Sequence, residues 1–180
     1  MDINPNVVAW VTVKDQGIST PVVKTNNQSE EDFYLNHDFK KNENDVGCPY
    51  QRSDTNIEQT DIATFIGHSA FNDVSLFGKQ YTKAIFAGLN NYLEETDEDN
   101  YNYEVVVETL TETYTYVIFA AISFDVNKDY TLQSEIYLKT NFQTQSEFNT
   151  YYRNVKKLSK LSSDQTVSYG DKLLTLFTCN

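Results

Sequence analysis

The chain has 180 residues, which suits one compact domain, and its 39% of strictly apolar residues include 11 Phe, 13 Tyr and one Trp. This composition excludes a disordered chain, and the small numbers of Gly and Pro exclude a collagen-like or low-complexity one. Because 14 Lys and Arg stand against 26 Asp and Glu, the net charge is −12. Recognition of phosphates needs a basic surface, so we expect no nucleic acid among the partners.

No stretch of the sequence is apolar for long enough to cross a membrane. Runs such as residues 117–122 contain about six apolar residues, whereas a membrane-spanning helix needs about 20. The chain begins with Met1 and Asp2 and shows no basic segment followed by an apolar one, which is the pattern of a signal peptide. This start indicates either a cytosolic protein or a chain from which such a segment has been removed.

The first part of the chain predicts two strands and a short helix. The β-branched run Val7–Val13 has the length of a strand, and a second strand, Ile18–Thr25, follows a polar turn. Pro21 places the second strand at a sheet edge or a bulge, because proline cannot donate a backbone hydrogen bond. A capping-box pattern at Ser29 predicts a short helix with His37 near its end, for which we expect a capping or packing role.

The middle of the chain predicts two further strands and then a helix. Gly47–Tyr50 and Ile62–Ile66 are short apolar stretches, and His68 lies just past the second of them. From position 74 to position 93, apolar residues recur every three or four positions, which is the period of an amphipathic helix. The acidic run Glu94–Asp99 would close this helix, and we interpret it as a solvated helix end.

The last part predicts a hairpin, a helix and a final strand. Tyr103–Thr109 alternates apolar and polar residues, and Tyr114–Phe124 is a longer and more apolar strand, so the two form a β-hairpin. A second capping-box pattern at Thr144 begins a helix that runs to Leu158, and Lys172–Cys179 is a strand. About seven strands with two or three helices favour a mainly antiparallel barrel or sandwich decorated with helices.

The chain has only two cysteines and two histidines. Two cysteines are too few for a disulfide framework, and neither belongs to a zinc-type pair, so we expect no metal and no cofactor. Cys48 is interpreted as a small packed residue, with a disulfide or a redox partnership with Cys179 as the alternative.

A thiol and an imidazole are the minimum for nucleophilic attack on a carbonyl carbon, with the imidazole moving the proton. Cys179 is the penultimate residue and ends the final strand, and His68 lies at the end of another apolar strand. Side chains at strand ends can project into a groove while the sheet fixes their position. The alternatives without function are a buried strand cysteine and a hydrogen-bonded loop histidine.

The segments around these two residues resemble those of sortases. Residues 175–179, Thr-Leu-Phe-Thr-Cys, match the TLxTC signature of that family, and residues 65–69, Phe-Ile-Gly-His-Ser, followed by residues 75–78, resemble the segment around the sortase histidine. Residues 4–11, residues 34–39 and a long His-to-Cys interval that contains a helix resemble the class B branch. The resemblance extends over nearly the whole chain.

This resemblance implies a mainly β fold with helices, an eight-stranded sortase barrel, and a single catalytic domain over residues 1–180. It also implies a cysteine transpeptidase in which Cys179 attacks the carbonyl of a threonine-like residue in the C-terminal sorting signal of a surface protein or pilin. His68 would be the general acid and base, and Thr175 and Thr178 of the signature would contact the substrate. The amine that resolves the thioacyl enzyme would come from a peptidoglycan precursor or from a pilin lysine. The implied location is the outer face of the cytoplasmic membrane of a Gram-positive bacterium, with an N-terminal anchor that this chain lacks.

The sequence departs from the family pattern at one point. Sortases place an essential arginine on the strand after the cysteine, where it stabilises the developing oxyanion or holds the substrate backbone, but this chain ends at Asn180. We therefore expect seven of the eight strands, a chain shortened at both ends, and little or no transpeptidation by it. Arg52 and Arg153 lie elsewhere, and we assign the role to neither. The alternatives are an inactive sortase-like barrel that binds sorting-signal peptides, and an unrelated cysteine hydrolase.

Overall fold

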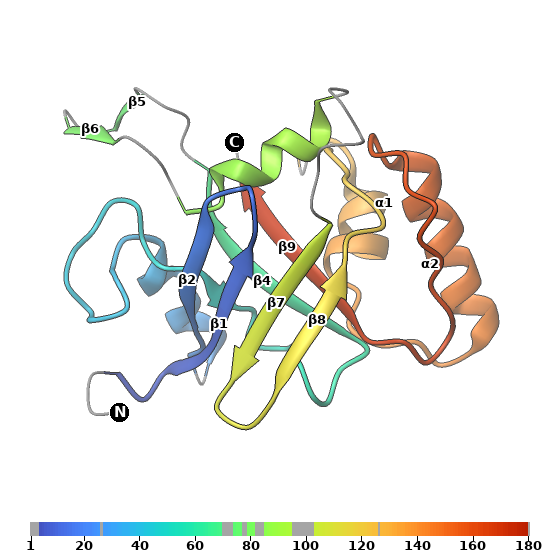
Figure 1. Cartoon of the computed structure of the whole chain (residues 1–180), viewed down its shortest axis with the longest axis horizontal. Coiled ribbons are helices and arrows are strands. Elements are labelled where there is room, and N and C mark those ends of the chain that lie inside the picture. Colours follow the sequence, from blue (N-terminus) through green and yellow to red (C-terminus); the bar gives the residue numbers. More distant parts are fainter. Residues whose placement is uncertain are drawn as a thin grey trace.

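A curved seven-stranded sheet that forms a nearly closed barrel dominates the fold (Figure 1). The structure is a computed structural model that describes residues 4–25, 27–69, 74–76, 79–81, 85–94, 103–125 and 127–179. The strand order in the sheet is β8-β7-β1-β2-β3-β4-β9. These strands are β1 (Val7–Val13), β2 (Ile18–Val23), β3 (Tyr50–Gln51), β4 (Ile62–His68), β7 (Glu104–Thr109), β8 (Thr113–Val117) and β9 (Leu173–Cys179).

The direction of the strands changes across the sheet. Antiparallel pairs join β8 to β7, β7 to β1, β1 to β2 and β3 to β4, whereas β2 with β3 and β4 with β9 are parallel. A separate antiparallel hairpin consists of β5 (Val74–Leu76) and β6 (Lys79–Tyr81). The parallel pair β4 and β9 lies at one edge of the sheet, and both strands end on the same side of the molecule (Figure 1).

Helical segments connect and cover the strands. The 3-10 helix η1 (Gln28–Leu35) follows β2, and a second 3-10 helix, η2 (Ala87–Leu93), crosses one end of the barrel in Figure 1. A short helix α1 (Tyr130–Leu132) continues into the π-helix η4 (Gln133–Tyr137), and α2 (Gln145–Leu158) packs at the side of the sheet.

The largest apolar cluster fills the interior of the barrel, because alternate residues of each strand point to the same face. In β1, Ala9, Val11 and Val13 are buried, whereas Trp10 is 42% exposed. The buried members of this interior cluster are Ala9, Val11, Val13, Ile18, Val22, Ile57, Ala63, Phe65, Phe86, Tyr92, Val105 and Val107.

Helix α2 begins and packs as the sequence predicts. The Thr144 side chain accepts a hydrogen bond from the backbone N–H of Glu147, which satisfies one of the free donors at the start of the helix. Phe148 and Val155 are buried in a cluster that also contains Ile62, the first residue of β4. This contact fixes the start of β4.

A third cluster, called the outer cluster below, covers the other face of the sheet near the end of β4. Tyr34 of η1, Cys48, and Ile66 of β4 are buried in it together with Val23 and Tyr50. The partly buried side chains packed against it are Val7, Leu35, Phe39, Tyr137 and Phe177. The outer cluster therefore connects η1, η4, β4 and β9.

The structure confirms most of the predicted elements, and it confirms a mainly β fold with helices. Strands cover 7–13 and 18–23, a hairpin forms from β7 and β8, a helix follows Thr144, and the last strand reaches Cys179. Pro21 lies where β2 pairs only with β1, since β2 meets β3 at Val23 alone, so the predicted edge position is confirmed. The predicted short helix is present as a 3-10 helix that begins at Gln28, but its N-cap is Asn27 without a side-chain cap, so the predicted capping box at Ser29 is wrong.

The predicted amphipathic helix over 74–93 is wrong. The segment contains strands β5 and β6 and, only at its end, the 3-10 helix η2. A side-chain carbon at Gly88 would lie 2.3 Å from the carbonyl oxygen of Gln16, so the backbone here packs against the turn between β1 and β2. The apolar residues belong to separate elements, and their helical spacing is a coincidence. Residues 95–99 of the acidic run lie outside the described residues.

Two predicted strands are shorter than expected. The strand predicted at 114–124 ends at Val117, because Ala121 hydrogen-bonds outside the sheet: its N–H donates to Ser159 Oγ at 3.1 Å, and its carbonyl accepts from the N–H of Lys160 at 2.8 Å. The strand predicted at 47–50 is reduced to Tyr50–Gln51, since Gly47 adopts a turn conformation with a φ of 68°.

Candidate active site

The parallel pairing of β4 and β9 places His68 directly opposite Cys179. The register runs in step from Ile62 with Leu173 to His68 with Cys179, without a shift. Because the strands are parallel, their carboxyl ends meet at the same edge of the sheet. Two residues that lie far apart in the sequence are thus neighbours at the end of the barrel.

Helix η1 orients the ring of His68. The Nε2 atom lies 2.8 Å from the backbone carbonyl oxygen of Leu35, which can only accept, so Nε2 carries the proton. In the neutral imidazole, Nδ1 is then the atom free to accept a proton. The ring is half-buried. Sequence reasoning missed Leu35, because a backbone acceptor has no side-chain signature.

Close packing fixes the backbone beneath His68. A side-chain carbon at Gly67 would lie 2.9 Å from the ring of Phe86, which is fully buried. The backbone N–H of Phe86 donates to the carbonyl of His68 at 3.1 Å. Glycine before the histidine therefore lets η2 approach β4 and hold its end in place.

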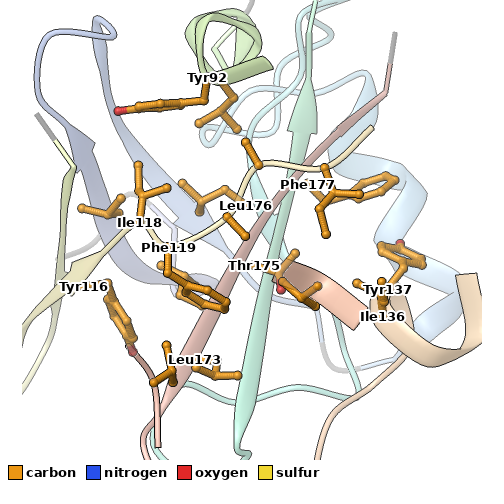
Figure 2. A pocket seen from close by; sticks show the side chains of 18 of the residues that line it. Tyr92, Tyr116, Ile118, Phe119, Ile136, Tyr137, Leu173, Thr175, Leu176 and Phe177 are labelled. Carbon is orange, nitrogen blue, oxygen red and sulfur yellow. The ribbon is translucent and has the colours of Figure 1, made fainter. Parts of the chain in front are cut away.

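A largely apolar cavity of about 690 Å³ lies along β9 (Figure 2). Thr175 and Thr178, the predicted substrate contacts, both line it. The hydroxyl of Thr178 is buried and, among the described residues, has no hydrogen-bond partner. The apolar side chains labelled around the cavity in Figure 2 are Ile118, Phe119, Ile136, Leu173, Leu176 and Phe177, with the rings of Tyr92, Tyr116 and Tyr137.

Tyr116 carries the other polar group of note in this cavity. Its hydroxyl is buried without a hydrogen-bond partner in the described part of the chain. Burial raises the pKa of Tyr116 to about 12, so the phenol stays neutral at physiological pH. A neutral phenol can donate one hydrogen bond to a bound peptide or accept one from it.

Cys48 and His37 have the packing roles that the sequence predicts. Cys48 is a free thiol that is 5% exposed, so the alternative of a disulfide is wrong. Its Sγ lies 3.6 Å from the carbonyl oxygens of Pro21 and Pro49, and burial raises its pKa to about 12. The ring of His37 stacks on Phe33 with 3.8 Å between centroids, and its Nδ1 lies 2.8 Å from the Phe33 carbonyl oxygen.

The two arginines have structural partners. Arg52 is buried and donates to Asp54 and to the backbone carbonyls of Tyr137 and Leu138. Arg153 is exposed on α2 and donates to the backbone carbonyl of Asn149 at 3.2 Å, one turn earlier in the same helix.

Two features of the described residues bear on ligands and membranes. Across the part of the chain that the structure describes, His, Cys, Asp and Glu form no cluster of three or more that could hold a metal ion. Within the same residues, no helix has the length and apolar character needed to cross a membrane.

Comparison with known proteins connects this geometry to a family. No family model matches the chain. It is 26% identical to sortase B of Listeria monocytogenes over 99% of its length, and 22% identical to sortase B of Staphylococcus aureus over 98%. The chain spans 64% of the length of each of these two relatives.

Solved structures give the same result. A mutant form of sortase B from Clostridium perfringens superposes with a TM-score of 0.81 at 26% identity, over 99% of this chain and 76% of that one. Sortase B from Listeria monocytogenes gives a TM-score of 0.75 at 25% identity, over 97% of this chain and 89% of that one. The chain therefore resembles the sortases in both sequence and fold. The curated relatives and these solved structures are all sortases B, and they support a class B sortase.

Proposed function

We propose that the protein is a cysteine transpeptidase in which Cys179 is the nucleophile and His68 the general acid and base. The observation that carries this proposal is the register of the parallel pair, which brings these two residues to one strand end. The relatives support it, since both are sortases B that match the chain over nearly its whole length.

Acylation of the thiol is the first step of the proposed reaction. The sulfur of Cys179 attacks the carbonyl carbon of a peptide bond in the sorting signal, so that an S–C bond forms and the C–N bond breaks. The imidazole of His68 accepts the thiol proton of Cys179 and then gives it to the leaving amine. The upstream part of the substrate remains on the enzyme as a thioester. No redox change occurs in this step.

An amine resolves the thioester in the second step. Its nitrogen attacks the thioester carbon, a new amide bond forms, and the C–S bond breaks to release Cys179. The proton lost by the amine passes to His68 or to the thiolate. A peptidoglycan precursor or a pilin lysine would supply this amine. Two sortase B structures, one in complex with triglycine and one in a substrate complex, support a site that takes peptides of these kinds.

The hydrogen bond between His68 and Leu35 suits this role. With Nε2 bound to the Leu35 carbonyl, Nδ1 is the atom that exchanges the proton. When the ring becomes an imidazolium, the same carbonyl accepts from the charged form and stabilises it. The substrate backbone would find a partner in Thr178, whose hydroxyl has none among the described residues.

We also propose that the protein acts at the outer face of the cytoplasmic membrane of a Gram-positive bacterium. Sortase substrates are surface proteins, and the amine acceptors belong to the cell wall or to pili. The species of the sortase B relatives are consistent with this location.

A peptide assay tests the proposed function. The chain, extended by the residues that its gene encodes after Asn180, is incubated with a sorting-signal peptide, with and without an amine acceptor, and the products are separated by mass. The 180-residue chain is assayed beside it and should show little or no transfer. Transfer to the amine supports a transpeptidase, and it should vanish in Cys179→Ala but persist in Cys48→Ala. Binding of the peptide without cleavage would contradict the proposal and favour the inactive peptide-binding barrel.

A further inference from the structure

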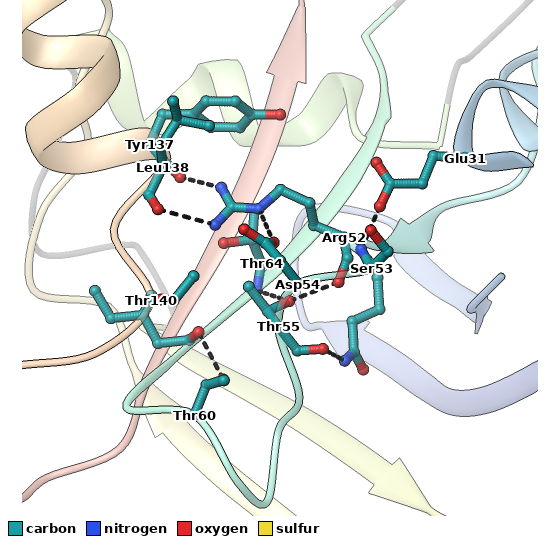
Figure 3. A network of polar contacts seen from close by, with 12 residues as sticks. Glu31, Arg52, Ser53, Asp54, Thr55, Thr60, Thr64, Tyr137, Leu138 and Thr140 are labelled. Atoms are coloured by element: carbon teal, nitrogen blue, oxygen red, sulfur yellow. Dashed lines mark hydrogen bonds and ion pairs between the residues drawn. The ribbon is translucent and has the colours of Figure 1, made fainter. Parts of the chain in front are cut away.

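Arg52 is a buried arginine whose main partners are backbone carbonyls (Figure 3). It follows β3 directly and is 5% exposed. Its Nη1 and Nη2 donate to the carbonyls of Tyr137 and Leu138, the second at 3.2 Å, while Nε donates to Asp54 at 2.5 Å. Its guanidinium carbon lies 5.2 Å from the centre of the Tyr137 ring.

These contacts show what the arginine holds in place. The side chain of Asp54 is 55% exposed, so the ion pair is screened by water and contributes little. The carbonyls of Tyr137 and Leu138 belong to the end of η4, where helix carbonyls lack partners within the helix. A planar guanidinium can bind two adjacent carbonyls and stack on the ring beside them, whereas a lysine cannot do both.

Tyr137 connects Arg52 to β9, the strand that carries Cys179. Its ring lies 4.4 Å, centroid to centroid, from the ring of Phe177 in β9, and both rings pack against the outer cluster. Phe177 is opposite Ile66 in the register, two pairs before His68 with Cys179. Leu35, which holds the His68 ring, packs against the same cluster.

We propose that Arg52 is a positioning residue of the candidate active site: it holds Tyr137 against Phe177 and so fixes the wall of the cavity along β9, where the sorting-signal peptide would bind. This inference rests on the proposed function, because the wall matters only if a peptide binds there. Arg52 acts through Tyr137 and touches neither the substrate nor the reacting atoms.

Substitution of the arginine tests this role. Arg52→Met keeps the length of the side chain and removes the donors, and Arg52→Lys keeps the charge without the planar fork. In both variants we expect KM for the sorting-signal peptide to rise by about 10- to 100-fold, the range typical of a displaced binding group, with kcat within about twofold. The matched control, Asp54→Asn, removes only the exposed partner and should leave KM unchanged.

Two further measurements keep the test decisive. The nuclear Overhauser contact between the Tyr137 and Phe177 rings should be lost in Arg52→Met. If Arg52→Met does not fold, Tyr137→Leu should give the same rise in KM, and Tyr137→Phe should not. The rate at which a small alkylating reagent modifies Cys179, and its pH dependence, should stay at parental values in every one of these variants.

The proposal is overturned if the contact between the two rings persists in Arg52→Met, or if KM stays within about twofold of the parent in both Arg52→Met and Tyr137→Leu. A changed pH profile of Cys179 alkylation would also overturn it, because Arg52 would then act on the thiol. Binding to an uncleavable peptide in the Cys179→Ala background separates the two proposals. Weaker binding caused by Arg52→Met supports the positioning role even if the parent cleaves nothing.

Discussion

The two cysteines differ in what their surroundings allow them to do. Cys48 is enclosed by the outer cluster, and burial holds its pKa at about 12, so its thiol is neutral at pH 7 and cannot act as a nucleophile. Cys179 instead lies at a strand end, opposite the only histidine that β4 contributes. The position of each cysteine in the fold therefore decides whether its thiol can act as a nucleophile.

Cys48 should make the protein less stable at high pH. Its folded pKa of about 12 lies above the ordinary value of 9.0, so between these values the unfolded chain loses a proton that the folded chain retains. The free energy of unfolding should fall through this window, by at most about 1.4 kcal/mol per pH unit for this group. Cys48→Ala should flatten that slope in urea titrations at several pH values, and an unchanged slope would contradict the assignment.

The sequence motifs single out the two residues that the proposed function assigns to the reaction, but not the residues that support them. Cys179 and His68 stand in short motifs, and the ends of apolar strands are readable from composition. Two supporting hydrogen bonds could not be predicted from the sequence: the one from His68 to the Leu35 carbonyl, and the one from Arg52 to the Tyr137 carbonyl. Backbone acceptors have no residue preference, and the partners lie on different elements. Only the folded chain brings η1, β3 and η4 to the same end of the barrel.

At the level of elements, the spacing of apolar residues predicts secondary structure correctly where a single helix or strand covers the whole periodic segment. Helix α2 has a cap and a continuous apolar face, and it was predicted correctly. The hairpin of β7 and β8 was also predicted, although its second strand ends at Val117 and not at 124. Residues 74–93 were misassigned because short strands and a 3-10 helix together imitate a helical repeat. The parallel pairing of β4 with β9 could not be predicted from the sequence, because the partners of a strand depend on the topology of the whole sheet.

The register of β4 and β9 can be checked by a cross-link. Neighbouring strands lie about 4.8 Å apart, within the range of about 4.4–6.8 Å between Cα atoms that a disulfide spans. His68→Cys should therefore form a disulfide with Cys179 under mild oxidation, as mapped by peptide mass spectrometry. Ile62→Cys, at the other end of β4, should form none, because six residues of strand span about 20 Å. A cross-link from Ile62→Cys alone would refute the register.

For the whole molecule, the net charge of −12 bears on the second substrate. An amine acceptor carries a positive charge at neutral pH, so the field of an acidic protein should raise its encounter rate. Raising the ionic strength from 0.01 M to 1 M shortens the screening length from about 30 Å to about 3 Å. We expect kcat/KM for a cationic amine to fall several-fold across this range, with hydrolysis of the thioester by water little changed. Equal salt dependence of both reactions would rule out steering.

The proposed function requires that Cys179 forms a thioester with the substrate in a site shared with His68. The direct measurement is the intact mass of the protein, extended by the residues that its gene encodes after Asn180, after a single turnover with a sorting-signal peptide and no amine. The modified residue is then mapped. We expect an added mass equal to the upstream fragment, located on Cys179 and released by hydroxylamine. This adduct should be absent in Cys179→Ala and strongly reduced in His68→Gln. An adduct on Cys48, or an equal yield in His68→Gln, would contradict it.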